Sequence, residues 1–509
     1  MRPRSALFTK QKQGVDFIKG GEGTIYLADI GTGKTATVLT AFADIQREDR
    51  AKGFGETRML VVAPRNVALN TWPDEPSEWQ HLAHLKVAAA AGTARRRAMA
   101  VEGDADAVAI SYDNLAWLMK SYPRGKLPFN VICFDEADKM KDPSTERMKP
   151  FYNPFLRKGQ DPVRTYSRLQ DFDLRIVMTG TPAPEGLTNL WSIQWLATLG
   201  EAFGTYRKLD VGARYSHFIE NFFVGSKWSW KIEPLDHTAE WVYEKLTPWT
   251  FRVELKDIDE LPPVHVVDRF YDLRPDVRAK YDQLEREFLL VVEREDEEVM
   301  LVEGTNAAVL QEKLRQMAAG FSYGEVNEER KTHWHDQEKM RMWADLRSEL
   351  MGQQLLTFYN FKAQREKLRE FAVGKSKKRP FYCLGGETSD RDAQAWIRAW
   401  NDGQITNLVA HPASAGHGLN LHRAGAHHMA FLTLPWSRAL YDQAIGRLHR
   451  TGQKEKVVVH RFLARDTVDE DVARALEQKG ATQRDVLNQM RDRTRAKWNT
   501  KRRSSKRSA

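Results

Sequence analysis

The chain alternates between short apolar runs and longer segments with the periodicity of helices, and it does so in two separate regions. Five apolar runs lie in the first region, at 24–28, 59–63, 107–110, 131–134 and 175–179. Five more lie in the second, at 355–358, 381–384, 408–410, 429–432 and 457–460. Continuous apolar strands that alternate with helices are typical of parallel sheets covered on both faces. We therefore expect an α/β fold with two lobes in tandem.

The segment between the two regions has a different character. From roughly residue 200 to 343 it is richer in aromatic and charged residues, and it reads as mostly helical, for example over 277–292. No repeat of fixed short period is evident along the chain. We expect four parts, namely a first lobe over 1–200, a mostly helical insertion and bridge over 201–343, a second lobe over 344–481, and a basic tail over 482–509.

Composition narrows the class of protein. With 509 residues the chain is too long for one core and suits two or three domains. Hydrophobic residues make up 41% and charged residues 29%, as in a globular protein, and no apolar stretch is long enough for a membrane span or a signal peptide. We expect a cytoplasmic protein. Cys133 and Cys383 each lie in an apolar run, which favours buried thiols over a disulfide or a metal site.

The net charge of +9 is unevenly distributed. Residues 491–509 contain nine basic side chains and one acidic side chain, so this end carries +8 of the total. A run of this kind is either a solubilising tail or an arm that grips nucleic-acid phosphates, and both remain open.

A glycine-rich string follows the first apolar run: Ala28-Asp29-Ile30-Gly31-Thr32-Gly33-Lys34-Thr35. A turn of this kind between a strand and a helix aims backbone amides at phosphate oxygens. We expect Gly31, Thr32, Gly33 and Lys34 to bind the phosphates of a nucleotide, with Lys34 on the β- and γ-phosphates. Thr35 would hold Mg²⁺ through its hydroxyl. The string departs from the full phosphate-loop pattern at its first position, where alanine replaces glycine.

A second string, Val131-Ile132-Cys133-Phe134-Asp135-Glu136-Ala137-Asp138, ends an apolar strand with two carboxylates. Asp135 at the strand tip can lie near the metal ion, while Glu136 polarises the attacking water. A solvated helix start would give the same pair by chance. Together with the glycine-rich string, however, the pair predicts a site that hydrolyses ATP.

The second region carries a string rich in arginine, from Tyr441 to Gln453. If the string is helical, Gln443, Arg447 and Arg450 fall at i, i+4 and i+7, on one face. Two guanidinium groups on an exposed face suit the role of arginine fingers, which neutralise charge on the γ-phosphate. The alternative is a surface stripe that pairs with carboxylates.

Four further segments fit such a site less specifically. Gly180, in the string 179–182, ends a strand where a tight turn can sense the γ-phosphate. Gly418 lies in a small-residue turn at 414–421 that suits close approach of a nucleotide. Arg65 follows another strand and could reach a nucleic-acid phosphate, and the aromatic and basic cluster at 227–231 could clamp nucleic acid. A plain structural turn, or aromatic packing for the cluster, is the alternative in each case.

Taken together these motifs resemble helicase superfamily two and, within it, the SWI/SNF-type DNA translocases. The resemblance runs from about Leu7 to Ala481. Gln11 stands at the glutamine of that family's adenine-reading segment, and 60–64 with Trp72 and Trp79 is similar to its next motif. The strings at 179–182, 416–421 and 443–453 match closely and differ from those of RNA helicases of the Asp-Glu-Ala-Asp class.

The resemblance implies two RecA-like lobes, ATP and Mg²⁺ as cofactors, and DNA as partner, in duplex form and without strong sequence preference. Its implied nucleotide contacts include Gln11, Gly418 and Gln443, and its implied catalytic groups are Glu136, Arg447 and Arg450. The chain departs from the family at 183–185 and 411–412. These departures argue against nucleosome remodelling. Because no domain that reads chromatin marks is evident, we expect a compact bacterial or phage form, which would act in the host cytoplasm if phage-encoded. A strand-separating DNA or RNA helicase, or a nucleic-acid clamp switched by ATP, remains the alternative.

Overall fold

The computed structural model describes residues 1–152, 167–180, 186–225, 232–258, 261–295, 304–326, 329–374, 380–385, 388–415, 419–478 and 489–496. Backbone contacts divide the chain into two compact units. The first comprises Met1–Glu260, and the second comprises the bulk of the chain from Leu261 to Ala509. None of the helices in the described ranges has the length and apolarity needed to traverse a lipid bilayer.

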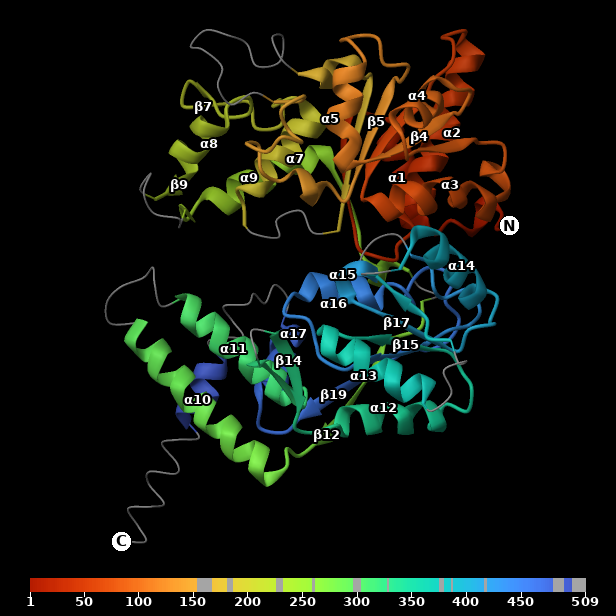
Figure 1. Ribbon diagram of the computed structural model, residues 1–509. Coiled ribbons are helices and arrows are strands. Elements are labelled where there is room, and N and C mark those ends of the chain that lie inside the picture. Colours follow the sequence, from red (N-terminus) through yellow and green to blue (C-terminus); the bar gives the residue numbers. More distant parts are fainter. Residues whose placement is uncertain are drawn as a thin grey trace. The chain divides into compact units, whose positions relative to one another are not determined.

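The first unit is built on a seven-stranded sheet in which every neighbouring pair is parallel (Figure 1). In spatial order its strands are β11 (Thr250–Val253), β1 (Gly23–Ala28), β6 (Leu174–Thr179), β5 (Val131–Asp135), β2 (Met59–Ala63), β4 (Ala107–Ser111) and β3 (Val87–Ala90). The order is not that of the sequence, so most connections cross over a face of the sheet and carry a helix.

Helices cover both faces of this sheet. Alternate residues of β2 enter different cores, since Leu60 and Val62 pack in one apolar cluster and Val61 and Ala63 in another. The first cluster also contains α4 (Ala94–Glu102), α5 (Tyr112–Ser121) and α7 (Asn189–Thr198), and the second contains α1 (Thr9–Lys19) and α2 (Lys34–Lys52). A strand buried on both sides must be apolar throughout, which explains why β2 reads as a continuous apolar run.

After α7 the chain adds a smaller helical part to the first unit. It contains α8 (Tyr215–Phe222), α9 (Thr238–Leu246) and two short strand pairs, which are β7 (Thr205–Tyr206) with β8 (Leu209–Asp210) and β9 (Phe223–Val224) with β10 (Glu233–Pro234). The chain then returns to the large sheet as β11, parallel to β1. This return strand matters for the site, because β1 leads into the glycine-rich turn.

The second unit has its own parallel sheet of six strands. Their spatial order is β12 (His265–Tyr271), β19 (Val458–Ala464), β18 (His428–Phe431), β15 (Leu355–Phe358), β17 (Asn407–Ala410) and β16 (Cys383–Leu384). The helices of this unit that follow its strands are α12 (Glu338–Glu349), α13 (Lys362–Val373), α14 (Asp390–Asn401), α15 (Pro412–Ala415), α16 (Arg438–Ile445) and α17 (Val468–Glu477).

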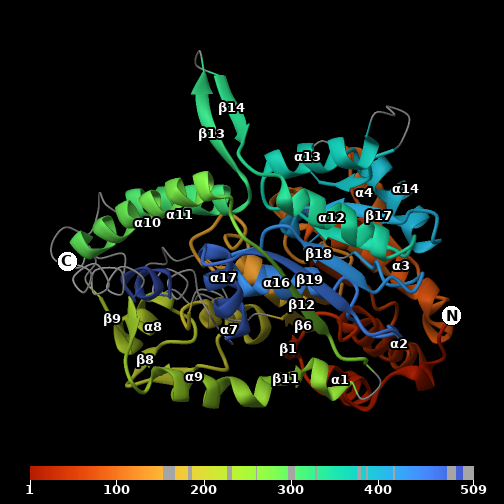
Figure 2. The same cartoon turned by 90° about the horizontal axis from the view of Figure 1, so that it is seen from below.

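Two additions decorate this second sheet. The helices α10 (Pro275–Glu295) and α11 (Gly304–Ala318) pack against each other. They are followed by a hairpin of β13 (Phe321–Val326) and β14 (Glu329–Trp334). Figure 2 shows this hairpin projecting away from the rest of its unit.

The two parallel sheets confirm the predicted α/β fold with two lobes. All ten predicted apolar runs contain strand residues, although only Cys383–Leu384 of the run 381–384 is strand. The segment 201–343 contains the helices α8 to α11, but it also contributes β11 to the first sheet and β12 to the second. Strand β12 lies at a sheet edge with exposed residues such as Val266 and Phe270, so it lacks the continuous apolar run by which central strands are identified.

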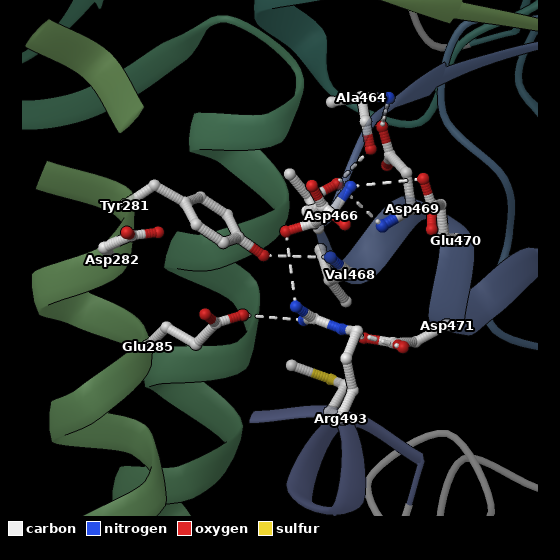
Figure 3. A network of polar contacts seen from close by, with 12 residues as sticks. Tyr281, Asp282, Glu285, Ala464, Asp466, Val468, Asp469, Glu470, Asp471 and Arg493 are labelled. Atoms are coloured by element: carbon white, nitrogen blue, oxygen red, sulfur yellow. Dashed lines mark hydrogen bonds and ion pairs between the residues drawn. The ribbon is translucent and has the colours of Figure 1, made fainter. Parts of the chain in front are cut away.

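The C-terminal helical residues 489–496 are fastened to the second unit through Arg493 (Figure 3). Its Nε lies 3.0 Å and 2.9 Å from the two carboxylate oxygens of Asp471 on α17, and its Nη2 lies 2.7 Å from Oε1 of Glu285 on α10. Nearby, the hydroxyl of Tyr281 accepts a hydrogen bond from the amide of Val468 at 2.9 Å. One of the nine basic residues counted in the tail is therefore a half-buried cation with a structural role.

Replacing Arg493 with alanine is expected to destabilise the second unit by about 3 kcal/mol. Asp471 and Glu285 are both fully buried, and removing one partner of a buried ion pair typically costs about 3 to 5 kcal/mol. Arg474 also bonds to Asp471, at 2.7 Å, which places the expected loss at the lower end. Urea denaturation measures the change. Arg495→Ala, at an exposed position of the same helix, is the control, and equal stability of the two variants would contradict the assignment.

Candidate active site

The glycine-rich turn joins β1 to α2 as predicted. Gly31 and Gly33 have positive φ angles of 89° and 75°, a conformation that only glycine adopts readily. The hydroxyl of Thr32 donates to the carbonyl oxygen of Asp29 at 2.7 Å and closes the turn. The turn ends at the first residue of a 19-residue helix, whose free amides and dipole favour a bound anion.

The departure from the phosphate-loop pattern at Ala28 falls outside the turn. Ala28 is the last residue of β1, pairs with Val253 of β11 and is buried. The next residue, Asp29, is held by β11 and its continuation, since its amide donates to the carbonyl oxygen of Val253 at 2.9 Å and its carboxylate accepts from the amide of Leu255 at 3.0 Å. A methyl group at position 28 therefore sits in the sheet and leaves the amides of the turn undisturbed.

Gln11, predicted to read adenine, forms hydrogen bonds with the backbone of the glycine-rich turn. Its side chain is fully buried, and Nε2 donates to the carbonyl oxygens of Thr32 and Gly33 at 3.2 Å and 3.3 Å. Its Oε1 accepts from the amide of Phe8 at 3.2 Å. The glutamine thus ties α1 to the phosphate turn, and direct contact with a base stays a prediction.

Three strand ends bring the predicted groups of the first unit together. Strands β1, β6 and β5 are neighbours and parallel, so their carboxyl ends share one edge of the sheet. Lys34 Nζ lies 3.7 Å from Glu136 Oε1, and a Cβ built at Gly180 would lie 3.7 Å from the same nitrogen. The ammonium group is shielded from solvent and forms no hydrogen bond within the described part of the chain. A buried cation without a hydrogen-bond partner fits the phosphates of a nucleotide.

The backbone at Glu136 is unusual. Its φ and ψ are both 55°, in the left-handed region, which non-glycine residues occupy at a cost of about 1 to 3 kcal/mol. The preceding residue ends β5, so the left-handed turn redirects the chain at the strand tip. Strain of this kind concentrates at functional sites, and here it accompanies the approach of the Glu136 carboxylate to Lys34.

Asp135 is a buried carboxylate at the tip of β5. Burial, and after it the neighbouring Glu136, raise its pKa to about 6, although Lys34 and the indole of Trp72 oppose this rise. Trp72 Nε1 donates to Asp135 Oδ2 at 3.0 Å. A carboxylate that loses its hydration is stabilised by a nearby cation, so this site fits a divalent metal ion.

The described residues contain no group of three or more His, Cys, Asp and Glu side chains that could hold a metal ion. Magnesium in nucleotide sites is bound by one or two protein groups together with the phosphates and water. Asp135 and Thr35, the second residue of α2, match that requirement. The donor set therefore suits Mg²⁺ held jointly with a nucleotide.

A recess lies along the same sheet edge of the first unit, beside the ends of other strands. It has a volume of about 260 Å³ and lies at the carboxyl ends of β2, β3 and β4. Its polar lining includes Arg65, Arg97, Ser111 and Asn114. Asn114 Nδ2 donates to Ser111 Oγ at 2.9 Å, and Arg97 stacks on Trp117 with its guanidinium carbon 4.3 Å from the ring centroid. Arg65, predicted to reach a nucleic-acid phosphate, thus lies beside other polar and cationic side chains.

In the second unit the arginine string is helical only at its start. Helix α16 ends at Ile445, and the residues that follow form turns, so the prediction of one continuous helical face was wrong beyond that point. Gly446, a poor helix former, stands at the end, and the amide of Arg447 turns back to the carbonyl oxygen of Ala444 at 3.2 Å.

The predicted residues of this string occupy different settings. Arg447 is buried, and its Nε donates to the carbonyl oxygen of Gln443 at 3.0 Å, so these two stay neighbours. Arg450 lies in the following turn and is half-buried, with its carbonyl oxygen accepting from the amide of Gln453 at 2.9 Å. Gly418, Thr181 and the cluster 227–231 lie outside the described residues.

Two residues acquire roles that sequence patterns did not indicate. Gln453 holds the turn after α16, because Nε2 donates to the carbonyl oxygens of Ala426 and Leu448 and Oε1 accepts from the amides of Lys454 and Glu455, all at 2.9 Å to 3.1 Å. Trp72 contacts Asp135 across 63 positions of sequence. Trp72 belongs to the motif formed by 60–64, Trp72 and Trp79, so the sequence marks it as notable. The residues around it do not indicate that its hydrogen-bond partner is Asp135.

Residues 11–208 match the SNF2-related domain, and residues 338–452 match the Helicase conserved C-terminal domain. The first match contains the glycine-rich turn and the carboxylate pair of the first unit. The second contains α16 and most of the arginine string of the second unit.

Several proteins are similar over most of the chain. Protein p41 of Acyrthosiphon pisum secondary endosymbiont phage 1 is 31% identical over 481 residues, which cover 91% of this chain and 94% of p41. YwqA of Bacillus subtilis strain 168, named as an ATP-dependent helicase/translocase, is 23% identical over 92% of this chain. The chain spans nearly all of p41 but only 47% of YwqA. Among solved structures, the Sulfolobus solfataricus SWI2/SNF2 ATPase core in complex with dsDNA is 22% identical, with 92% of this chain and 90% of that chain covered and a TM-score of 0.41.

Proposed function

The chain belongs to the SNF2-related family of helicase superfamily two, an ATPase family, and from this premise we propose that it is a motor that couples ATP hydrolysis to movement along duplex DNA. The observation that carries the proposal is the meeting of Lys34, Glu136 and Gly180 at one edge of the first sheet, beside the buried carboxylate of Asp135. The name of YwqA as a helicase/translocase points in the same direction.

The chemistry follows from the groups at this edge. The amides of the glycine-rich turn and the ammonium of Lys34 bind the phosphates of ATP, and Asp135 and Thr35 would hold Mg²⁺ with them. A metal ion held there would neutralise negative charge on the phosphates. Glu136 orients a water molecule for attack on the γ-phosphate. Arg447 and Arg450 supply positive charge to the same phosphate in the transition state.

Contact with the DNA backbone is the second half of the proposal. The recess offers the guanidinium, hydroxyl and amide groups of Arg65, Arg97, Ser111 and Asn114, all of which bind phosphate oxygens. It is also lined by Asp113, whose carboxylate is paired with Arg147 at 2.8 Å. Contacts to phosphates carry no sequence information, so binding is expected to show little sequence preference and to weaken steeply with salt. Because DNA and ATP meet in the cytoplasm, we place the protein there, in the host cytoplasm if it is phage-encoded.

We expect duplex DNA to stimulate ATP turnover more than single-stranded DNA or RNA does. A steady-state ATPase assay with the three nucleic acids, at two salt concentrations, measures this directly. Stimulation by duplex DNA should fall as salt rises, because each neutralised phosphate contributes to the salt slope. Unwinding of a forked duplex would instead favour a strand-separating helicase, and slow turnover with tight ATP-dependent DNA binding would favour a clamp.

A further inference from the structure

The indole of Trp72 donates a side-chain hydrogen bond to the carboxylate of Asp135. The tryptophan begins α3 (Trp72–Asp74), directly after a π-helical turn at Val67–Thr71. Both partners are buried, and Nε1 lies 3.0 Å from Oδ2. π-helical turns are rare and are frequent at functional sites, which draws attention to a tryptophan placed by one.

Several hydrogen bonds hold Asp135, one of them from the backbone of Glu136 to its carboxylate. Trp72 binds its carboxylate, and the hydroxyl of Tyr112 donates to its backbone carbonyl oxygen at 2.9 Å. Trp72 is itself fixed, because its amide donates to the carbonyl oxygen of Val67 and its ring is fully buried in the apolar cluster on one face of the sheet. The carboxylate therefore has little freedom to rotate.

The chemical nature of this donor is informative. An indole N–H is neutral at every physiological pH and donates one hydrogen bond. A lysine or arginine in its place would stabilise the carboxylate equally well but would repel a divalent cation at the same site. A neutral donor on one oxygen fixes the orientation of the group and leaves its negative charge for a metal ion.

We propose that Trp72 is a positioning residue for the divalent metal ion, which it serves by fixing the orientation of the Asp135 carboxylate. This rests on the proposed function, because the metal ion is part of the nucleotide site. Removing a group that hydrogen-bonds to a metal ligand typically lowers the affinity for the metal by about 10- to 100-fold. Trp72 contacts no nucleotide in this scheme and acts only through Asp135.

Trp72→Phe removes the donor and keeps an aromatic ring. Trp79→Phe is a matched control, because Trp79 is equally buried and its Nε1 donates to Oε1 of Glu75 at 2.9 Å, away from Asp135. We expect Trp72→Phe to bind Mn²⁺ about 10-fold more weakly in the presence of a slowly hydrolysed ATP analogue, as measured by electron paramagnetic resonance. The Mg²⁺ concentration for half-maximal ATP turnover should rise by the same factor, and Trp79→Phe should match the parent in both.

Both phenylalanine variants lose a buried hydrogen bond, so a loss of thermal stability in both is expected and does not decide the matter. If Trp72→Phe does not fold, benzothienylalanine incorporated at position 72 replaces only the N–H by sulfur and preserves the ring shape. The proposal would be overturned if Trp72→Phe or the benzothienylalanine variant bound Mn²⁺ as tightly as the parent. It would also be overturned if Trp79→Phe weakened Mn²⁺ binding as much as Trp72→Phe does. Absence of DNA-stimulated turnover in the parent would defeat the proposed function instead, and the Mn²⁺ measurement would still stand.

Discussion

Replacing Glu136 with glutamine is expected to reduce ATP turnover at least about 100-fold and to leave ATP binding intact. A group that orients or deprotonates the attacking water typically contributes about 10² to 10⁴ in rate. Glutamine keeps the size of the side chain but removes the negative charge that lies 3.7 Å from Lys34. In the proposed site the amides of the turn and Lys34 bind the phosphates, so the affinity for ATP should be unchanged or slightly higher.

Two measurements test this prediction together. Steady-state turnover with duplex DNA reports the chemical step, and binding of a fluorescent ATP analogue reports the ground state. Glu146→Gln is a suitable control, since Glu146 is an exposed carboxylate paired with Lys149. A Glu136→Gln protein that hydrolyses ATP as fast as the parent would remove Glu136 from the mechanism.

The sequence predicted structure best where a single physical requirement, such as burial on both faces or a left-handed backbone, decides which residue types are allowed. Strands such as β2 and β5 are buried on both faces, so each is a continuous apolar run that can be recognised without structure. The glycine-rich turn needs left-handed backbone at Gly31 and Gly33, and glycine supplies it. Fold class and the groups at the first sheet edge could be predicted for these reasons.

Strand β12, at one edge of the second sheet, escaped prediction because it is not buried on both faces. Strand β12 reads His265–Tyr271 with charged and apolar residues mixed, and the structure exposes Val266 and Phe270. Only its parallel pairing with β19, almost 200 positions away, makes it a strand. A local pattern cannot contain that information, so the segment between the two sheets was interpreted as helical.

The roles of individual side chains could not be predicted from the sequence for a related reason. A motif names Gln11 and Trp72, but their partners are the turn at Thr32 and the carboxylate at Asp135, which only the folded chain brings near. The end of α16 at Ile445 was likewise decided by turn hydrogen bonds beyond it. Residue types could be predicted, whereas the atom that each residue contacts could not.

Arg447→Ala is expected to lower ATP turnover by about 10³-fold. A guanidinium group that stabilises the γ-phosphate in the transition state is worth about 10³ to 10⁵ in rate. Arg447 belongs to the second unit, whereas the turn, Lys34 and Asp135 belong to the first. ATP binding should therefore change far less than turnover, because the loss falls mainly on the transition state.

A second arginine variant separates a catalytic role of Arg447 from a purely structural one. Arg447 is buried and its Nε donates to the carbonyl oxygen of Gln443, so its removal also costs local stability. Arg438→Ala, at the start of α16, which leads into the turn that holds Arg447, removes an arginine bonded to Asp442 at 2.8 Å and controls for that cost. Turnover that falls in both variants in proportion to their loss of thermal stability would assign Arg447 to the architecture of the turn. A 10³-fold loss confined to Arg447→Ala, with ATP affinity preserved, is the result that chemistry at the γ-phosphate requires.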